Sequence, residues 1–211
     1  MSYETSRTSY ERSVLLETTI AADPLVQLRL WLDDAYAAKL REPNAMALAT
    51  VDADGTPSVR MVLLRGLDAR GPAFYTSYGS RKGLAIAHEA RVALTFWWSE
   101  LERQVRIEGR AEQLSDDESE IYFSSRPRGH QISAWASEQS SPVDSRETLE
   151  ERMRHFDERF GKEEVPRPHS WGGYVIIPMR IEFWQGRANR AHDRFEFLRQ
   201  GSSWIRQRLQ P

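Results

Sequence analysis

Two short runs near the C-terminus place a large aromatic ring beside cations and an imidazole. They are Ile-Glu-Phe-Trp-Gln at 181–185 and Arg-Ala-His-Asp-Arg at 190–194. Arginine carries a planar, permanently charged fork that suits phosphates and electron-rich rings, and Trp184 offers a flat apolar face with one hydrogen-bond donor. His192 could act as a general base, because histidine titrates near neutrality. Together these side chains favour a flat, anionic, heteroaromatic ligand.

Cations in two other segments could also bind anions. Residues 60–65 are expected on one strand, where side chains alternate, so that Arg60 and Arg65 would point to opposite sides. From spacing alone, two solvated charges are the simpler interpretation. Arg81 and Lys82 open a predicted helix, whose free amide donors and partial positive charge suit a terminal phosphate. An ordinary capped surface helix is the alternative.

Two further arrangements depend on spacing. Tyr122 and Arg126 are four residues apart, so on a continuous helix they would share a face and form a hydroxyl and guanidinium pocket for a phosphate. An ordinary amphipathic helix end is the alternative. Arg190, His192 and Arg194 are spaced two residues apart, so on a strand all three would share one face. A lone histidine, however, is more often structural.

The order of predicted elements indicates a mainly β protein with helices, in the α+β class. Helices are expected from Pro24 to before Pro43 and at 80–88, 115–127 and 144–161, and strands at 45–51, 57–66, 73–77, 91–98, 103–114, 173–178, 180–185, 193–199 and 204–208. Short turns between strands favour an antiparallel barrel over a doubly wound sheet. A Gly-x-Gly-x-x-Gly loop is absent, which argues against a Rossmann nucleotide site.

The 181–194 segment closely resembles the C-terminal signature of the pyridoxamine/pyridoxine 5'-phosphate oxidases, FMN enzymes that make pyridoxal 5'-phosphate. The resemblance extends from Arg7 to Pro211, with Ala191 in place of a usually larger aliphatic residue. It implies an antiparallel, FMN-binding split β-barrel with peripheral helices, and a homodimer with FMN at the subunit interface. The implied reaction oxidises pyridoxamine 5'-phosphate and pyridoxine 5'-phosphate with O2, giving pyridoxal 5'-phosphate and hydrogen peroxide.

The resemblance also implies roles for individual residues. Positions matching the FMN site are Arg60, Met61, Val62, Leu63, Arg65, Tyr75, Thr76, Arg81, Lys82, Gln104, Gln139, Ser140, Trp184 and Arg194. Positions matching the substrate site are Arg7, Tyr10, Arg65, Tyr122, Arg126, His130, Arg190 and His192, of which Arg190 and His192 are the expected catalytic residues. Arg65 stands where the family usually has lysine, and His130 where many relatives have serine.

Length and composition limit the remaining possibilities. The chain has 211 residues, and we expect a flexible N-terminal arm at 1–20 and a single domain at 21–211. Cysteine is absent and the five histidines show no ligand spacing, so the sequence predicts no metal site. A net charge of −2 gives no general attraction to nucleic acid or anionic membranes. With no membrane-length apolar run and no signal peptide, the expected location is the cytoplasm.

Two other functions stay open from the sequence. A related split-barrel flavin oxidase could act on another substrate, such as a phenazine precursor. It would keep the flavin residues and lose the phosphate-binding ones, whereas this chain has Tyr122, Arg126, Arg190 and His192. A non-catalytic flavin- or pyridoxal-phosphate-binding protein would use the same binding residues, and turnover with oxygen would separate it from an enzyme.

Overall fold

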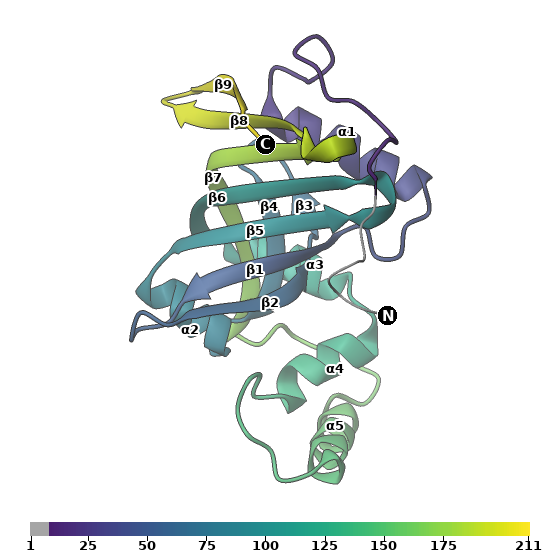
Figure 1. Cartoon of the computed structure of the whole chain (residues 1–211). Coiled ribbons are helices and arrows are strands. Elements are labelled where there is room, and N and C mark those ends of the chain that lie inside the picture. The colour runs from purple at the N-terminus through teal and green to yellow at the C-terminus, as the bar shows by residue number, and fades with distance from the viewer. Residues whose placement is uncertain (1–8) are drawn as a thin grey trace.

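The computed structural model describes residues 9–211, and its centre is one antiparallel sheet that curls on itself (Figure 1). Along the sheet the order is β2-β1-β5-β6-β7-β4-β3, and β8 and β9 extend it from β7. The nine strands in this part of the chain are β1 (Ala45–Val51), β2 (Pro57–Leu63), β3 (Gly66–Leu67), β4 (Pro72–Ser77), β5 (Arg91–Trp98), β6 (Arg103–Gln113), β7 (Trp171–Gln185), β8 (Asp193–Gln200) and β9 (Ser203–Leu209). The predicted antiparallel barrel is confirmed.

Strand β7 divides the sheet into two halves. It pairs with β6 along its length, with β4 through its first residues and with β8 through its last. The register with β6 shifts at Met179, because Gly109 faces Pro178 while Glu108 faces Arg180. The prediction of two separate strands here was wrong: the proline lies at a β-bulge, where its missing N–H is tolerated and the strand continues. A side chain at Gly109 would clash with the backbone oxygen of Ile177 on β7.

The core fills the inside of the curled sheet. Alternate residues of β1, β5 and β6 are buried, and phenylalanines supply half of the largest fully buried side chains, among them Phe74, Phe96, Phe183, Phe195 and Phe197. Helix α1 (Pro24–Ala37) closes one side, with the Trp31 ring edge-on to Phe183 at a centroid distance of 5.2 Å. Its start agrees with the prediction, since the Asp23 carboxylate accepts the amides of Leu25 and Val26.

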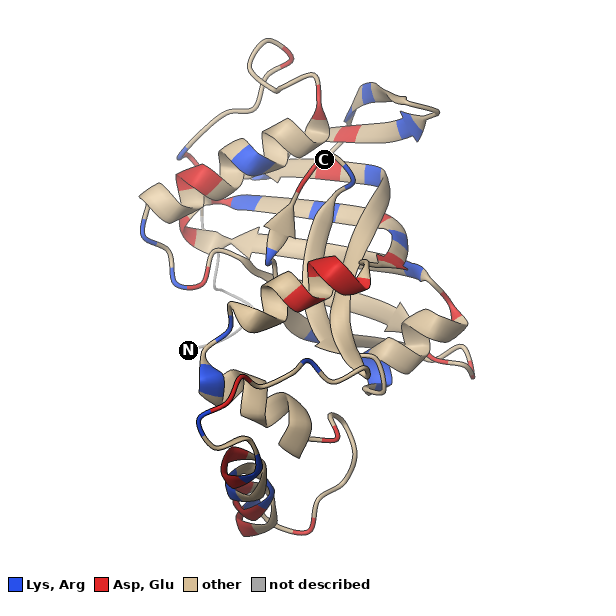
Figure 2. Cartoon of the chain, turned by 180° about the vertical axis from the view of Figure 1, so that it is seen from behind, with Lys and Arg blue, Asp and Glu red and all other residues tan. Residues whose placement is uncertain are grey.

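The remaining helices lie at the periphery. They are α2 (Arg81–His88), α3 (Asp116–Ser124), α4 (Arg128–Ala136) and α5 (Arg146–Phe160). Helices α4 and α5 project from the barrel (Figure 1) and share a small core that includes Ile132 and Phe156. None of the residues of α5 is buried, and Figure 2 shows acidic and basic residues along the whole helix. Helix α4 was not predicted, because its nine residues carry too few apolar side chains for a clear helical period.

The first described residues pack on the barrel rather than extending from it. Leu15 and Ile20 are buried in the main core, and the main-chain amide of Arg12 donates to Glu102 at 3.0 Å. The division into an arm at 1–20 and a domain at 21–211 stays a prediction.

We expect the packing of Phe183 to dominate the stability of the barrel. Its side chain is fully buried and meets the rings of Trp31 and Phe197 edge-on. Phe183→Ala should lower the free energy of unfolding by about 3–5 kcal/mol. Ile121→Ala, at a side chain that is 74% exposed, should change it by less than about 0.5 kcal/mol. Urea unfolding at one protein concentration measures both, and equal losses would contradict this account of the core.

Candidate functional site

A buried lysine lies where β4 ends and α2 begins. Lys82 is 8% exposed, and its Nζ donates to Thr76 Oγ1 at 3.0 Å, Ser80 Oγ at 3.2 Å and Gln139 Oε1 at 3.1 Å. All three partners are neutral. Burial, reinforced by the nearby charge of Arg60, lowers the pKa of Lys82 to about 8. No carboxylate of the described residues accepts a hydrogen bond from this ammonium group, so its positive charge favours an anionic ligand.

Two arginines flank this lysine and differ in their pairing. Arg60, on β2, donates to the hydroxyls of Thr50 and Ser58, both at 2.7 Å, and burial lowers its pKa. Arg81, at the start of α2, is largely exposed and forms an ion pair with Asp52, with Nε 2.9 Å from Oδ2. Arg60, which donates to hydroxyls and not to a carboxylate, is therefore more available to bind an anion than Arg81.

Arg126, between α3 and α4, forms a second cationic group together with the aromatic rings around it. Its guanidinium carbon lies 4.5 Å from the centroid of Trp171, and within residues 9–211 its buried Nη1 has no hydrogen-bond partner. Tyr75 stacks on Tyr122 at a centroid distance of 3.8 Å beside the same tryptophan. Burial lowers the pKa of Arg126, and the charge of Arg65 adds to the effect. A buried, unpaired guanidinium N–H requires an acceptor, and an anionic oxygen supplies the strongest one.

Gln139 connects these two groups. With Arg126 it lines a small cavity of about 110 Å³, and with Arg81 and Ser140 it lines a cleft of about 410 Å³. Ser140 adopts a left-handed φ of 76°, so the loop turns sharply at this point. We call Arg60, Thr76, Lys82, Arg126 and Gln139 the cationic half-site.

The predicted C-terminal residues form a separate cluster. The imidazole of His192 lies 4.6 Å from Trp184 between ring centroids, and Tyr10 meets both rings edge-on. The backbone N–H of Arg187 donates to Nδ1 of His192 at 3.1 Å. The neutral ring that fits this bond carries its hydrogen on Nε2. We call Tyr10, Gln104, Trp184, His192 and Arg194 the aromatic half-site.

Burial and the charges around His192 both favour its neutral form. Burial lowers its pKa, and the charges of Arg190 and Arg194 lower it further. Arg190 ends a 3-10 turn at Ala188–Arg190 with a left-handed φ of 61°, and β8 starts only at Asp193. The prediction that Arg190, His192 and Arg194 share a strand face was therefore wrong, since only the last lies on a strand.

One outward face of the sheet carries several of the predicted residues. Gln104 on β6 lies between Trp97 on β5 and Trp184 on β7 in the ladder. At the β2 edge of this face, Val59 and Met61 are 68% and 64% exposed. Of the other residues predicted on β2, Val62 packs against the core and Leu63 ends the strand.

Three further predicted residues are not counted in either half-site, although the charge of Arg65 acts on Arg126. Arg65 is exposed between β2 and β3 rather than on a long strand, because β2 ends at Leu63. His130 is exposed on the first turn of α4. Arg7 lies outside the described residues.

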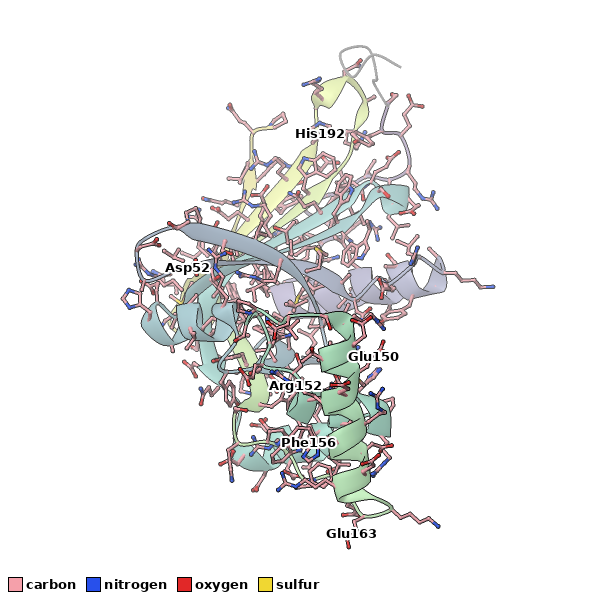
Figure 3. All side chains as sticks on the ribbon, turned by 90° about the horizontal axis from the view of Figure 1, so that it is seen from below. Asp52, Glu150, Arg152, Phe156, Glu163 and His192 are labelled. Atoms are coloured by element: carbon pink, nitrogen blue, oxygen red, sulfur yellow. The ribbon has the colours of Figure 1, made fainter. Side chains whose placement is uncertain are left out.

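The two half-sites do not meet within one chain. Among residues 9–211, no hydrogen bond, ion pair or ring contact joins them, and Figure 3 shows His192 well apart from Asp52, the partner of Arg81. The cationic half-site has unbalanced positive charges that suit phosphates, and the aromatic half-site has a ring surface and an imidazole.

Some residues that support the site were missed by the sequence analysis. Glu182 is buried and holds the Nε of Arg194 at 2.8 Å, and Asp193 is buried beside His192. Alternation along residues 180–185 places Glu182 and Trp184 on one face. From this pattern, an ion pair between the glutamate and a cation of the same face could have been predicted. The position of Trp171 beneath Arg126 had no sequence signal.

The fold and the two half-sites define a split β-barrel of the flavin-binding class. A sequence model described as "Pyridoxamine 5'-phosphate oxidase" matches residues 32–160, and one described as "Pyridoxine 5'-phosphate oxidase C-terminal dimerisation region" matches residues 171–211. The chain belongs to the pyridoxamine 5'-phosphate oxidase family.

Similar proteins agree with this assignment. The chain is 54% identical to a pyridoxine/pyridoxamine 5'-phosphate oxidase from Cupriavidus necator over 97% of each chain, and 55% identical to one from Bordetella avium over 100% of each. Among solved structures, PhzG from Burkholderia lata, in complex with tetrahydrophenazine-1-carboxylic acid, has a TM-score of 0.89 at 31% identity over 97% of this chain and 100% of that one. An FMN binding protein from Nostoc punctiforme shares the fold, with a TM-score of 0.72 at 15% identity, covering 90% and 100%.

Within 9–211, no three His, Asp or Glu side chains cluster in a way that could hold a metal ion. No helix in this range has the length and apolar character needed to cross a membrane.

The lowered pKa of Lys82 predicts how stability changes with pH. Between about pH 8 and pH 10.5 the unfolded lysine holds a proton that the folded one has lost. The contribution of Lys82 to the free energy of unfolding should therefore increase with pH across this range. Lys82→Met should remove that increase, whereas Lys162→Met, at an exposed position, should keep it. Urea unfolding of the ligand-free protein measures this, and equal pH slopes in wild type and Lys82→Met would contradict it.

Proposed function

We propose that this protein is an FMN-dependent oxidase that converts pyridoxamine 5'-phosphate and pyridoxine 5'-phosphate to pyridoxal 5'-phosphate, with O2 as electron acceptor. The observation that carries the proposal is the pair of adjoining, unbalanced cationic groups around Lys82 and Arg126. Two phosphate monoesters, one on the cofactor and one on the substrate, match two such groups. Family membership and relatives of that name at 54–55% identity support it.

The residues present fit FMN. Lys82 and Arg60 would hold its phosphate, with the hydroxyl of Thr76 beside them. Trp184 and Gln104 would border the ring, since an amide can bond the carbonyl edge without adding a titratable group. When bound, the flavin supplies the two-electron oxidation. A phosphate held among side chains leaves little room for an adenylate, so we expect FMN rather than FAD.

The chain's own residues would bind and orient the substrate. The unpaired Nη1 of Arg126 would donate to the substrate phosphate, and Tyr122 and Arg65 lie close enough to this group to add to it. His192, neutral and with its hydrogen on Nε2, would donate to the substrate ring. Arg190 would bind a substrate oxygen from the adjacent turn. Holding the reacting groups in one orientation is a large part of what a protein adds to flavin chemistry.

A homodimer would join the two half-sites. The cationic half-site of one copy would face the aromatic half-site of its partner, giving two complete sites per dimer. The match of residues 171–211 to a dimerisation region supports this arrangement. The exposed apolar side chains of Val59, Met61 and Trp97 lie on the same outward face and would be covered by the partner.

The structural likeness to PhzG favours a second candidate, an oxidase of a tetrahydrophenazine-type substrate. A tricyclic acid without a phosphate would leave the Arg126 group unbalanced, and PhzG is less similar in sequence than the relatives above. Turnover separates the candidates: we expect hydrogen peroxide and pyridoxal 5'-phosphate from pyridoxine 5'-phosphate. Oxidation of a phenazine precursor alone would favour the second, and no turnover of either would favour a non-catalytic binding protein.

Three variants test the assignment of the C-terminal residues. Arg190→Ala and His192→Ala should lower kcat/KM about ten- to a hundredfold, because each loses a hydrogen bond to a desolvated substrate, while FMN content stays near normal. Arg194→Ala should instead lower FMN occupancy. Flavin absorbance of the purified proteins and peroxide release give both quantities.

The matched control is Arg199→Ala, which removes an arginine of the same strand that contacts Trp204. It should leave flavin content and turnover near those of wild type. Flavin loss in His192→Ala, together with full flavin and activity in Arg194→Ala, would show that the roles are assigned wrongly.

A further inference from the structure

One buried carboxylate links three segments that are far apart in the sequence. Asp193 is 8% exposed, and its Oδ2 accepts the backbone N–H of Leu15 at 3.1 Å and Nη1 of Arg187 at 3.0 Å. Its Oδ1 accepts Nη1 of Arg208 at 2.7 Å. These partners belong to the N-terminal segment, to the turn before β8 and to β9. Asp193 thus holds all three together at the first residue of β8.

The ionised form of Asp193 is favoured by these bonds. Burial by itself would raise its pKa, but the hydrogen bonds from Leu15, Arg208 and Arg187 outweigh this, so that the pKa is lowered. Removal of this carboxylate would take from Arg187 its counter-charge, while Arg208 would keep its ion pair with Glu17.

Arg187 carries the effect of this carboxylate to the imidazole. Its side chain is bound by Asp193, while its own backbone N–H donates to Nδ1 of His192. The preceding residue is fixed as well, since the amide of Gly186 donates to the carbonyl of Glu102 at 2.7 Å. A side chain at Gly186 would lie 2.7 Å from the ring of Tyr10, so the turn and Tyr10 are closely packed. The side chain of Arg187 is bound by Asp193 and the preceding amide by Glu102, and these contacts direct the backbone N–H of Arg187 toward His192.

We propose that Asp193 is a positioning residue: through Arg187 it keeps the His192 imidazole in the Nε2–H form and in one orientation beside Trp184. The importance of that form for turnover rests on the proposed function. The fixing of the tautomer does not, because it follows from hydrogen bonds within this chain.

The test uses the full chain with FMN bound and compares three variants. Asp193→Asn keeps the size of the side chain and removes its charge, and Arg187→Met removes only the link to the turn. Arg208→Met is the matched control, because it removes another partner of the same carboxylate and does not touch the turn. Nitrogen-15 NMR of the histidine ring reports the tautomer of His192, and steady-state kinetics with pyridoxine 5'-phosphate report kcat and KM.

In wild type and Arg208→Met we expect a single Nε2–H tautomer. In Asp193→Asn and Arg187→Met we expect a mixture of tautomers and a fall of about tenfold in kcat, with unchanged flavin content. Arg187 is partly exposed, so Arg187→Met should fold even where Asp193→Asn does not. A single unchanged tautomer in Arg187→Met would overturn the proposal. Absence of wild-type turnover would refute the proposed function and leave the tautomer result to decide this inference.

Discussion

Buried positive charge without a balancing carboxylate is the constraint on which this structure depends. In the part of the chain that the structure describes, the ammonium group of Lys82 has only neutral partners, and Nη1 of Arg126 has none. Removing a cation from water is costly unless hydrogen bonds or an opposite charge compensate for it. Thr76 near the end of β4 accepts a hydrogen bond from Lys82, and Trp171 at the start of β7 packs against Arg126. An anionic ligand would supply the missing negative charge. Binding of such a ligand is therefore expected to raise the free energy of unfolding.

The second constraint is the separation of the half-sites. β7 pairs with β6 along its length, and on its other edge it pairs with β4 before the bulge around Met179 and with β8 after it. Trp171 at its start lies under Arg126, and Trp184 near its end lies beside His192. A single strand thus contributes to both half-sites at opposite ends. This geometry gives each chain two incomplete sites, and a symmetric pair of chains can complete both.

Much of the fold could be predicted from the sequence, because its signals were local. Asp23 and Ser80 cap helices where expected, and alternation located most strands. Helix α4 and the single β7 strand were missed, since a weak apolar period and an internal proline both suggest a break. In the site, spacing located the cations but not their partners: nothing local indicates that Asp52 pairs with Arg81. The functional roles came from resemblance to a family and not from spacing.

The claim that two copies form each site can be tested most directly with hybrid dimers. Arg126→Ala alters the cationic half-site and His192→Ala the aromatic one, and each homodimer alone should be nearly inactive. In a purified hybrid of the two chains, one site would contain both defects and the other neither, so activity should recover to about half of the wild-type value per dimer. If each chain carried a whole site of its own, every site in the hybrid would be defective, and a hybrid with no more activity than the single variants would contradict the account.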